Sequence, residues 1–231
     1  MSIDSVPGLR LRILLVGLPL AGGAGLAVYV LAGISLPLAI LVLAVVGALA
    51  WVLIVRRLGG SARAALRERA LVGIVAGLVA TAAYDTARYG VVAALQMSFA
   101  PFHVFDLFGE LFIGTGHDRT LTFLVGLSYH VANGTFFGVG YTLLFRRPTW
   151  WTGTIWGVGL ELCMAALYPR WLRIQVMHEF LEVSAVGHVV YGTVLGLVAA
   201  AGVRRLTRSR PPARMPSESV SSEPVKEVNR P

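Results

Sequence analysis

The chain has 231 residues, of which 56% are hydrophobic and 14% are charged, and its mean hydropathy is +0.71. This composition excludes an ordinary soluble domain and is typical of a multi-pass membrane protein. The formal net charge of +8 does not indicate nucleic-acid binding, because most of the arginines lie in short segments between apolar stretches.

Six apolar stretches approach the ~20 residues that a helix needs to cross a bilayer. We therefore predict an all-α bundle of six transmembrane helices, which together form one integral membrane domain over residues 1–206. The predicted spans cover residues 13–31, 36–55, 70–95, 121–145, 150–167 and 183–203. Residues 207–231 are rich in Pro, Ser, Glu and Arg, so we expect a disordered tail there.

The basic residues predict how the bundle is oriented. Of the 20 Lys and Arg residues, 16 lie on one side of the predicted spans, and the other four are Arg88, Arg119, Arg170 and Arg173. An excess of Lys and Arg marks the cytoplasmic side of a membrane protein. We expect a cell-membrane protein with both termini in the cytoplasm and with external loops after the third and fifth spans.

The first two spans contain no candidate site residue, and the first external loop contains only secondary candidates. The hairpin over residues 13–55 has no ionisable residue inside the membrane, which predicts a lipid-facing support. In the loop, residues 99–113 predict a short interfacial helix whose polar arc contains His103, Asp106 and Glu110. Such a helix is more often an anchor at the lipid headgroups than a lid.

The most informative motif is a nine-residue sequence that occurs twice within the predicted spans. HVANGTFFG begins at His130 and HVVYGTVLG begins at His188, and five of the nine positions are identical. The span before each copy contains a glycine pair, GIVAG at residues 73–77 and GTIWG at residues 153–157. These matches predict a duplicated two-helix unit, made of spans three and four and of spans five and six.

The His-led, glycine-rich spans resemble those of small uncharacterised bacterial polytopic membrane proteins. The resemblance covers the third to the sixth span. It implies a multi-pass membrane protein and brings no established activity, so no functional residue is carried over from it.

Four ionisable residues are predicted to lie in the external half of the membrane: Asp85, His130, Glu161 and His188. An ionisable side chain there is costly, so it usually faces a partner or a cavity rather than lipid. Imidazole and carboxylate are ligands of zinc, manganese and non-haem iron, so our leading hypothesis is a metal site made of these four residues. Secondary candidates are Asn133, Tyr191, His103, Asp106, Glu110 and His178.

Three alternatives stay open, and no catalytic residue is assigned. His130 and His188 alone are suitable axial ligands for haem b. Alternatively, the histidines and carboxylates line the cavity of a proton-coupled or small-solute transporter. In the third alternative, the protein is a non-catalytic partner subunit or a homo-oligomer in the lipid bilayer, and its histidines only form hydrogen bonds across helix contacts.

Overall fold

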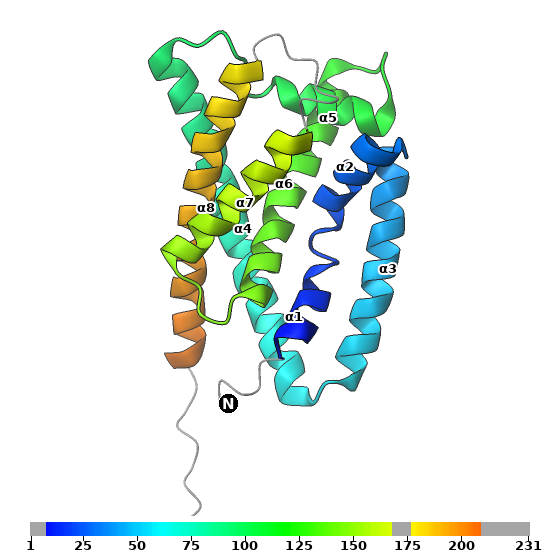
Figure 1. Ribbon diagram of the computed structural model, residues 1–231, viewed down its shortest axis with the longest axis vertical. Coiled ribbons are helices and arrows are strands. Elements are labelled where there is room, and N and C mark those ends of the chain that lie inside the picture. Colours follow the sequence, from blue (N-terminus) through cyan, green and yellow to red (C-terminus); the bar gives the residue numbers. More distant parts are fainter. Residues whose placement is uncertain (1–7, 168–176, 209–231) are drawn as a thin grey trace, which may run out of the picture.

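In the computed structural model, residues 8–167 and 177–208 are described, and the regular secondary structure of these residues is entirely α-helical (Figure 1). The prediction of an all-α fold is therefore confirmed. The helices are α1 (Leu9–Val16), α2 (Ala21–Ala32), α3 (Leu36–Arg57), α4 (Gly60–Leu95), α5 (His103–Ile113), α6 (Arg119–Leu144), α7 (Trp150–Leu167) and α8 (Met177–Arg208).

The number of helices suited to crossing a membrane differs from the predicted six. Within the described ranges, α3, α4 and α8 are long and apolar enough to cross, and α1 with α2 would make a fourth span if the bent pair crosses as one. The other two predicted spans, α6 and α7, do not meet this criterion. Both helices carry strongly polar residues in their apolar sequence, His130 and Asn133 in α6 and Glu161 in α7.

The prediction of one unbroken first span over residues 13–31 is wrong. The α1 and α2 axes are bent by 65° across the break between Val16 and Ala21. Pro19 lies in this break, and it has no backbone N–H with which to continue a helix. After the bend, α2 packs against α3 and α6.

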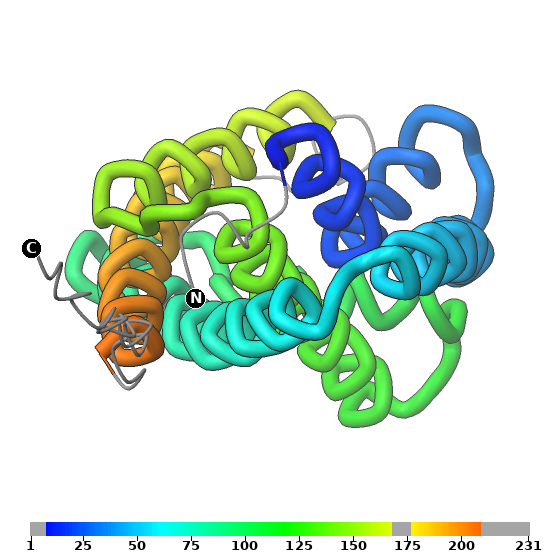
Figure 2. Tube along the Cα trace, turned by 90° about the horizontal axis from the view of Figure 1, so that it is seen from below, coloured from blue at the N-terminus to red at the C-terminus, as the bar shows by residue number. Residues whose placement is uncertain are grey.

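The bundle is built around α4. This helix packs against α6 on one side and against α8 on another, while α7 packs on α8 and α5 packs on α6. Figure 2 shows the same arrangement along the bundle, with α7 and the α1–α2 pair on the side away from α4. The helices α6 and α7 pack on different partners, α6 on α4 and α7 on α8, and they make few close contacts with each other.

In the two helix pairs α4–α6 and α7–α8, the helices approach each other most closely at glycines. A Cβ atom at Gly77 would lie 2.8 Å from the carbonyl oxygen of Gly134, and a Cβ at Gly192 would collide with the carbonyl oxygen of Gly153. Small residues at such positions let two helix backbones approach closely in a membrane. Gly134 and Gly192, which take part in these two contacts, occupy the same position in the two copies of the repeated motif.

The starts of α1 and α4, the ends of α3 and α8 and the turn between α6 and α7 lie together at the lower end of Figure 1, and most arginines of the described residues belong to these segments. The Arg69 guanidinium donates hydrogen bonds to the carbonyl oxygens of Thr142, Phe145 and Arg146, at 2.9, 3.0 and 2.8 Å, and Arg12 donates to that of Leu144. These cations satisfy carbonyls at the C-terminal end of α6, where the helix dipole is negative. Arg170, Arg173 and the predicted tail beyond residue 208 lie outside the described residues.

The loop helix α5 begins at His103, four residues later than the prediction. It packs on α6 so closely that a Cβ at Gly109 would collide with the Thr122 carbonyl, and Phe105 is buried. Its Asp106 carboxylate lies 3.5 Å from the His103 ring and 3.7 Å from the Arg119 guanidinium. The helix is therefore fixed to the bundle end that contains the first external loop of the prediction.

Candidate functional site

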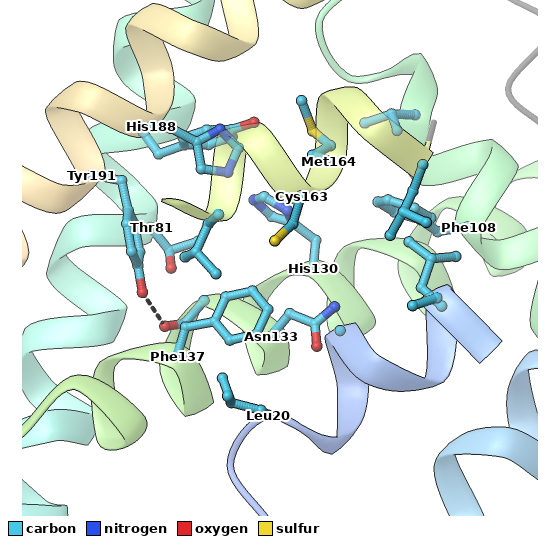
Figure 3. A pocket seen from close by; sticks show the side chains of 18 of the residues that line it. Leu20, Thr81, Phe108, His130, Asn133, Phe137, Cys163, Met164, His188 and Tyr191 are labelled. Atoms are coloured by element: carbon cyan, nitrogen blue, oxygen red, sulfur yellow. Dashed lines mark hydrogen bonds between the residues drawn. The ribbon is translucent and has the colours of Figure 1, made fainter. Parts of the chain in front are cut away.

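A pocket of about 340 Å³ lies between α2, α4, α5, α6, α7 and α8 (Figure 3). This volume falls within the usual range of small-molecule sites, roughly 300–1,000 Å³. His130 and His188 both line the pocket, and most of its other lining is apolar. Because α2 forms part of the wall, the prediction that the first hairpin serves only as a lipid-facing support is wrong. The apolar lining includes Leu20, Leu26, Phe108, Phe137, Leu160 and Met164.

The first polar pair joins α6 to α4. Nε2 of His130 lies 3.1 Å from Oδ2 of Asp85, and Oδ1 of Asp85 lies 3.6 Å from Nη1 of Arg88. Because a carboxylate oxygen only accepts, Nε2 carries the proton in this contact. Within the described residues no hydrogen bond reaches Nδ1 of His130, so this atom can accept one from a bound molecule.

The second polar pair joins α8 to α7. Nδ1 of His188 lies 2.7 Å from Oε2 of Glu161 and 3.1 Å from the carbonyl oxygen of Ser184. The Ser184 hydroxyl donates to the same Glu161 oxygen at 2.9 Å. The two nearest neighbours of Nδ1 only accept, and the Ser184 hydroxyl, 3.3 Å from Nδ1, gives its proton to Glu161, so Nδ1 carries a proton. Within the described part of the chain, Nε2 of His188 has no hydrogen-bond partner.

Tyr84 connects the two pairs. Its ring centroid lies 5.7 Å from that of His130 and 4.9 Å from that of His188, so the two imidazole centroids are at most 10.6 Å apart, the sum of 5.7 and 4.9 Å. The Tyr84 hydroxyl lies 3.3 Å from the Ser184 hydroxyl. The histidines of the two helix pairs thus share one neighbour and one pocket, as their matching motif positions suggest.

The charges of the two pairs differ because of Arg88. This side chain is only 1% exposed, donates to the Pro101 carbonyl oxygen at 2.6 Å and lies over the Tyr84 and Phe99 rings. Its positive charge balances the negative charge of Asp85, so the Asp85–His130 pair needs no second proton on the imidazole to be neutral. No ion pair within the described ranges joins Glu161 to Lys or Arg. The Glu161–His188 pair is therefore neutral only when it binds one additional proton.

The predicted metal site is not assembled in this arrangement. Within residues 8–167 and 177–208, no group of three or more His, Cys, Asp or Glu side chains is placed to hold a metal ion. The four proposed ligands instead form two separate pairs, and in each pair the carboxylate occupies a ring nitrogen of the histidine. Neither Asp85 nor Glu161 lines the pocket.

The secondary candidates divide into two groups. Asn133 and Tyr191 line the pocket, although the Tyr191 hydroxyl is already used, because it donates to the Gly134 carbonyl oxygen at 2.6 Å (Figure 3). The other four are not in the pocket lining. They are His103, Asp106 and Glu110 on α5 and His178 at the start of α8.

Sequence reasoning missed the roles of Tyr84 and of α2. Tyr84 directly precedes the candidate Asp85 but carries no pattern of its own. The α2 wall had a usable signal, since Pro19 interrupts the span and the small residues Gly23 and Ala24 follow it. Comparisons with protein-family models, curated proteins and solved structures gave no match.

Proposed function

We propose that this protein is a multi-pass membrane protein that binds a small, mainly apolar molecule in the pocket and couples this binding to proton exchange at the Glu161–His188 pair. The main observation in support is that both motif histidines line one pocket. Their carboxylate partners, Asp85 and Glu161, contact the histidines but are not part of the pocket lining. A carboxylate that holds one ring nitrogen fixes the orientation of the imidazole and leaves the other nitrogen for a ligand.

The proposal includes α6 and α7 as membrane-crossing helices beside α3, α4 and α8. At 1.5 Å per residue, the 26 residues of α6 extend about 39 Å and the 18 residues of α7 about 27 Å. The hydrocarbon core is about 30 Å thick. Their polar residues turn toward the pocket or toward partners, which is how such residues are tolerated in a membrane. With the arginine-rich end in the cytoplasm, the pocket lies in the external half.

The charge balance selects Glu161–His188 as the proton-exchanging pair. An uncompensated buried carboxylate is costly, so the pair is more stable with a second proton on the imidazole. The other polar groups around this pair are Ser184, Tyr84 and, beyond Tyr84, Arg88. A bound molecule that contacts Nε2 of His188 changes the cost of that proton, and this would link binding to proton exchange. Proton-coupled transport of the bound molecule is one use of such a pair.

Titration calorimetry on the protein in lipid nanodiscs tests the proposal. The probe is 4-nonylphenol, with empty nanodiscs as the blank, and each titration is run in phosphate and in Tris at the same pH. These buffers differ in ionisation enthalpy, so a difference in binding heat counts the protons exchanged. We expect a buffer-dependent heat for the wild type and none for Glu161→Gln. The matched control Glu182→Gln changes an exposed carboxylate on α8 and should behave like the wild type.

Two results would overturn the proposal. If 4-nonylphenol produces no heat beyond the blank, the pocket does not bind this class of molecule. If the wild type binds it with the same heat in both buffers, or if Glu161→Gln keeps the buffer dependence, the Glu161–His188 pair does not exchange the proton.

Haem b is the second candidate, because two motif histidines, each with one ring nitrogen available, line the same pocket. The test is an absorption spectrum of the purified protein, as isolated and after addition of haemin. A Soret band that is lost in both His130→Gln and His188→Gln would support this candidate. No Soret band in the protein as isolated, together with an unshifted free-haemin band after the addition, would exclude it.

A further inference from the structure

The pocket reaches the outside of the bundle between α2 and α7. Ala24 on α2 and Cys163 on α7 both line the pocket, and both are exposed. The close partners of α2 are α3 and α6, and the close partner of α7 is α8, whereas α2 and α7 are not closely packed on each other. Ala24 and Cys163 therefore mark an opening, which we call the α2–α7 mouth.

The outer surface beside this mouth is apolar. Leu162, which directly precedes Cys163 in the sequence, is 66% exposed, and it forms one exposed apolar face of α7 with Ile155 and Val158. Cys163 lies 13 residues after Trp150, which corresponds to about 20 Å along the helix. This depth falls inside a hydrocarbon core about 30 Å thick when α7 crosses the membrane. The surroundings of the mouth are therefore those of a lipid-facing surface.

The polar groups of the pocket come from other helices than the mouth. Tyr84 and Arg88 belong to α4, His130 to α6 and His188 to α8. Neutral His130 accepts a hydrogen bond through Nδ1, whereas His188 with its second proton donates one through Nε2. A hydroxyl group suits either imidazole because it both donates and accepts. The positive charge of Arg88 is already balanced by Asp85, so a bound molecule needs no negatively charged head group beside Arg88.

We infer that the bound molecule is a neutral amphiphile with a hydroxyl head, dissolved in the membrane, which enters through the α2–α7 mouth instead of from water. This inference rests on the proposed function and names its substrate class and route. The hydroxyl head lies at the imidazole wall of the pocket, and the apolar body lies along the lining from α2, α6 and α7.

Cys163 is the single cysteine of the chain, so one nitroxide spin label attaches at the mouth without any substitution. In nanodiscs, collisions of the label with oxygen report lipid exposure, and collisions with a water-soluble nickel chelate report water exposure. Two reference sites are made in a Cys163→Ala background. Leu49→Cys lies on the outer face of α3, where Leu49 is 61% exposed, and Ser61→Cys lies at the arginine-rich end of α4.

We expect the Cys163 label to match the Leu49→Cys reference, with oxygen collisions in excess of nickel collisions. A label that matches the Ser61→Cys reference would overturn the route through lipid, even if the buffer-dependent heat of 4-nonylphenol remains.

A second measurement uses unlabelled protein. Ala24→Trp narrows the mouth and should weaken calorimetric binding of 4-nonylphenol at least tenfold, whereas Leu49→Trp should leave it unchanged. Decanol, a neutral hydroxyl amphiphile, should compete with 4-nonylphenol better than the anion decanoate does. Unchanged binding in Ala24→Trp, or stronger competition by decanoate, would contradict the inference.

Discussion

Replacing Glu161 with glutamine keeps the size of the side chain but removes its negative charge. The Glu161 and His188 side chains are only 12% and 15% exposed, so solvent screens their interaction little. Glu161 makes two charge-assisted contacts, at 2.7 Å to Nδ1 of His188 and at 2.9 Å from the Ser184 hydroxyl. Hydrogen bonds to charged groups contribute about 1.5–3 kcal/mol and neutral ones about 0.5–1.5 kcal/mol. The loss is thus about 1 kcal/mol per contact, or about 2 kcal/mol in total.

Thermal unfolding in nanodiscs measures this loss. For a chain of this length, about 2 kcal/mol corresponds to a fall in Tm of about 4–8 °C. The exposed control Glu182→Gln should stay within about 0.5 kcal/mol of the wild type. A Glu161→Gln protein as stable as the wild type, or more stable, would refute the reasoning. In that case the native pair either carries an unbalanced charge that glutamine relieves or contains a protonated Glu161.

Three further predictions concern the same bundle. Asp85→Asn leaves the buried guanidinium of Arg88 without its carboxylate partner, so it should lower the free energy of unfolding by about 3–5 kcal/mol. If thermal unfolding shows a smaller loss than for Glu161→Gln, Asp85 does not neutralise Arg88 as described. Gly192→Ala should lower the Tm because its Cβ collides with the Gly153 backbone, whereas Gly159→Ala, where a Cβ meets open space, should raise it slightly; equal effects would argue against the close α7–α8 contact. Arg69→Gln removes charge-assisted bonds to the end of α6 and should increase hydrogen exchange of the last turn of α6 without changing that of α5.

The all-α class and most helix positions were predictable because their causes are local. Apolar stretches of sufficient length indicate helices, and residues 150–167 form α7 with the predicted boundaries. The bend between α1 and α2 was missed, although Pro19 provides a local reason for it. Of the six predicted spans, three correspond to described helices that are long and apolar enough to cross by length and composition alone, because α6 and α7 carry polar residues that the length of an apolar stretch does not reveal.

The candidate site was predictable in its members but not in its pairing. Equal depth and matching faces placed His130, His188, Asp85 and Glu161 at one level of the bundle. Helical periodicity does not determine whether a carboxylate points into a pocket or lies behind a histidine, because that depends on how neighbouring helices are rotated. The arrangement of the α4–α6 and α7–α8 pairs therefore separates a four-ligand metal site from two histidine–carboxylate pairs.

The most direct test of the central claim is the ¹⁵N NMR spectrum of the histidine rings in nanodiscs, with assignments from His130→Gln and His188→Gln. We predict a proton on Nε2 of His130 and on Nδ1 of His188, and we predict that 4-nonylphenol shifts the opposite nitrogen of each of these two rings. If the compound shifts neither ring, or if Nε2 of His130 or Nδ1 of His188 carries no proton, the two-pair pocket is wrong.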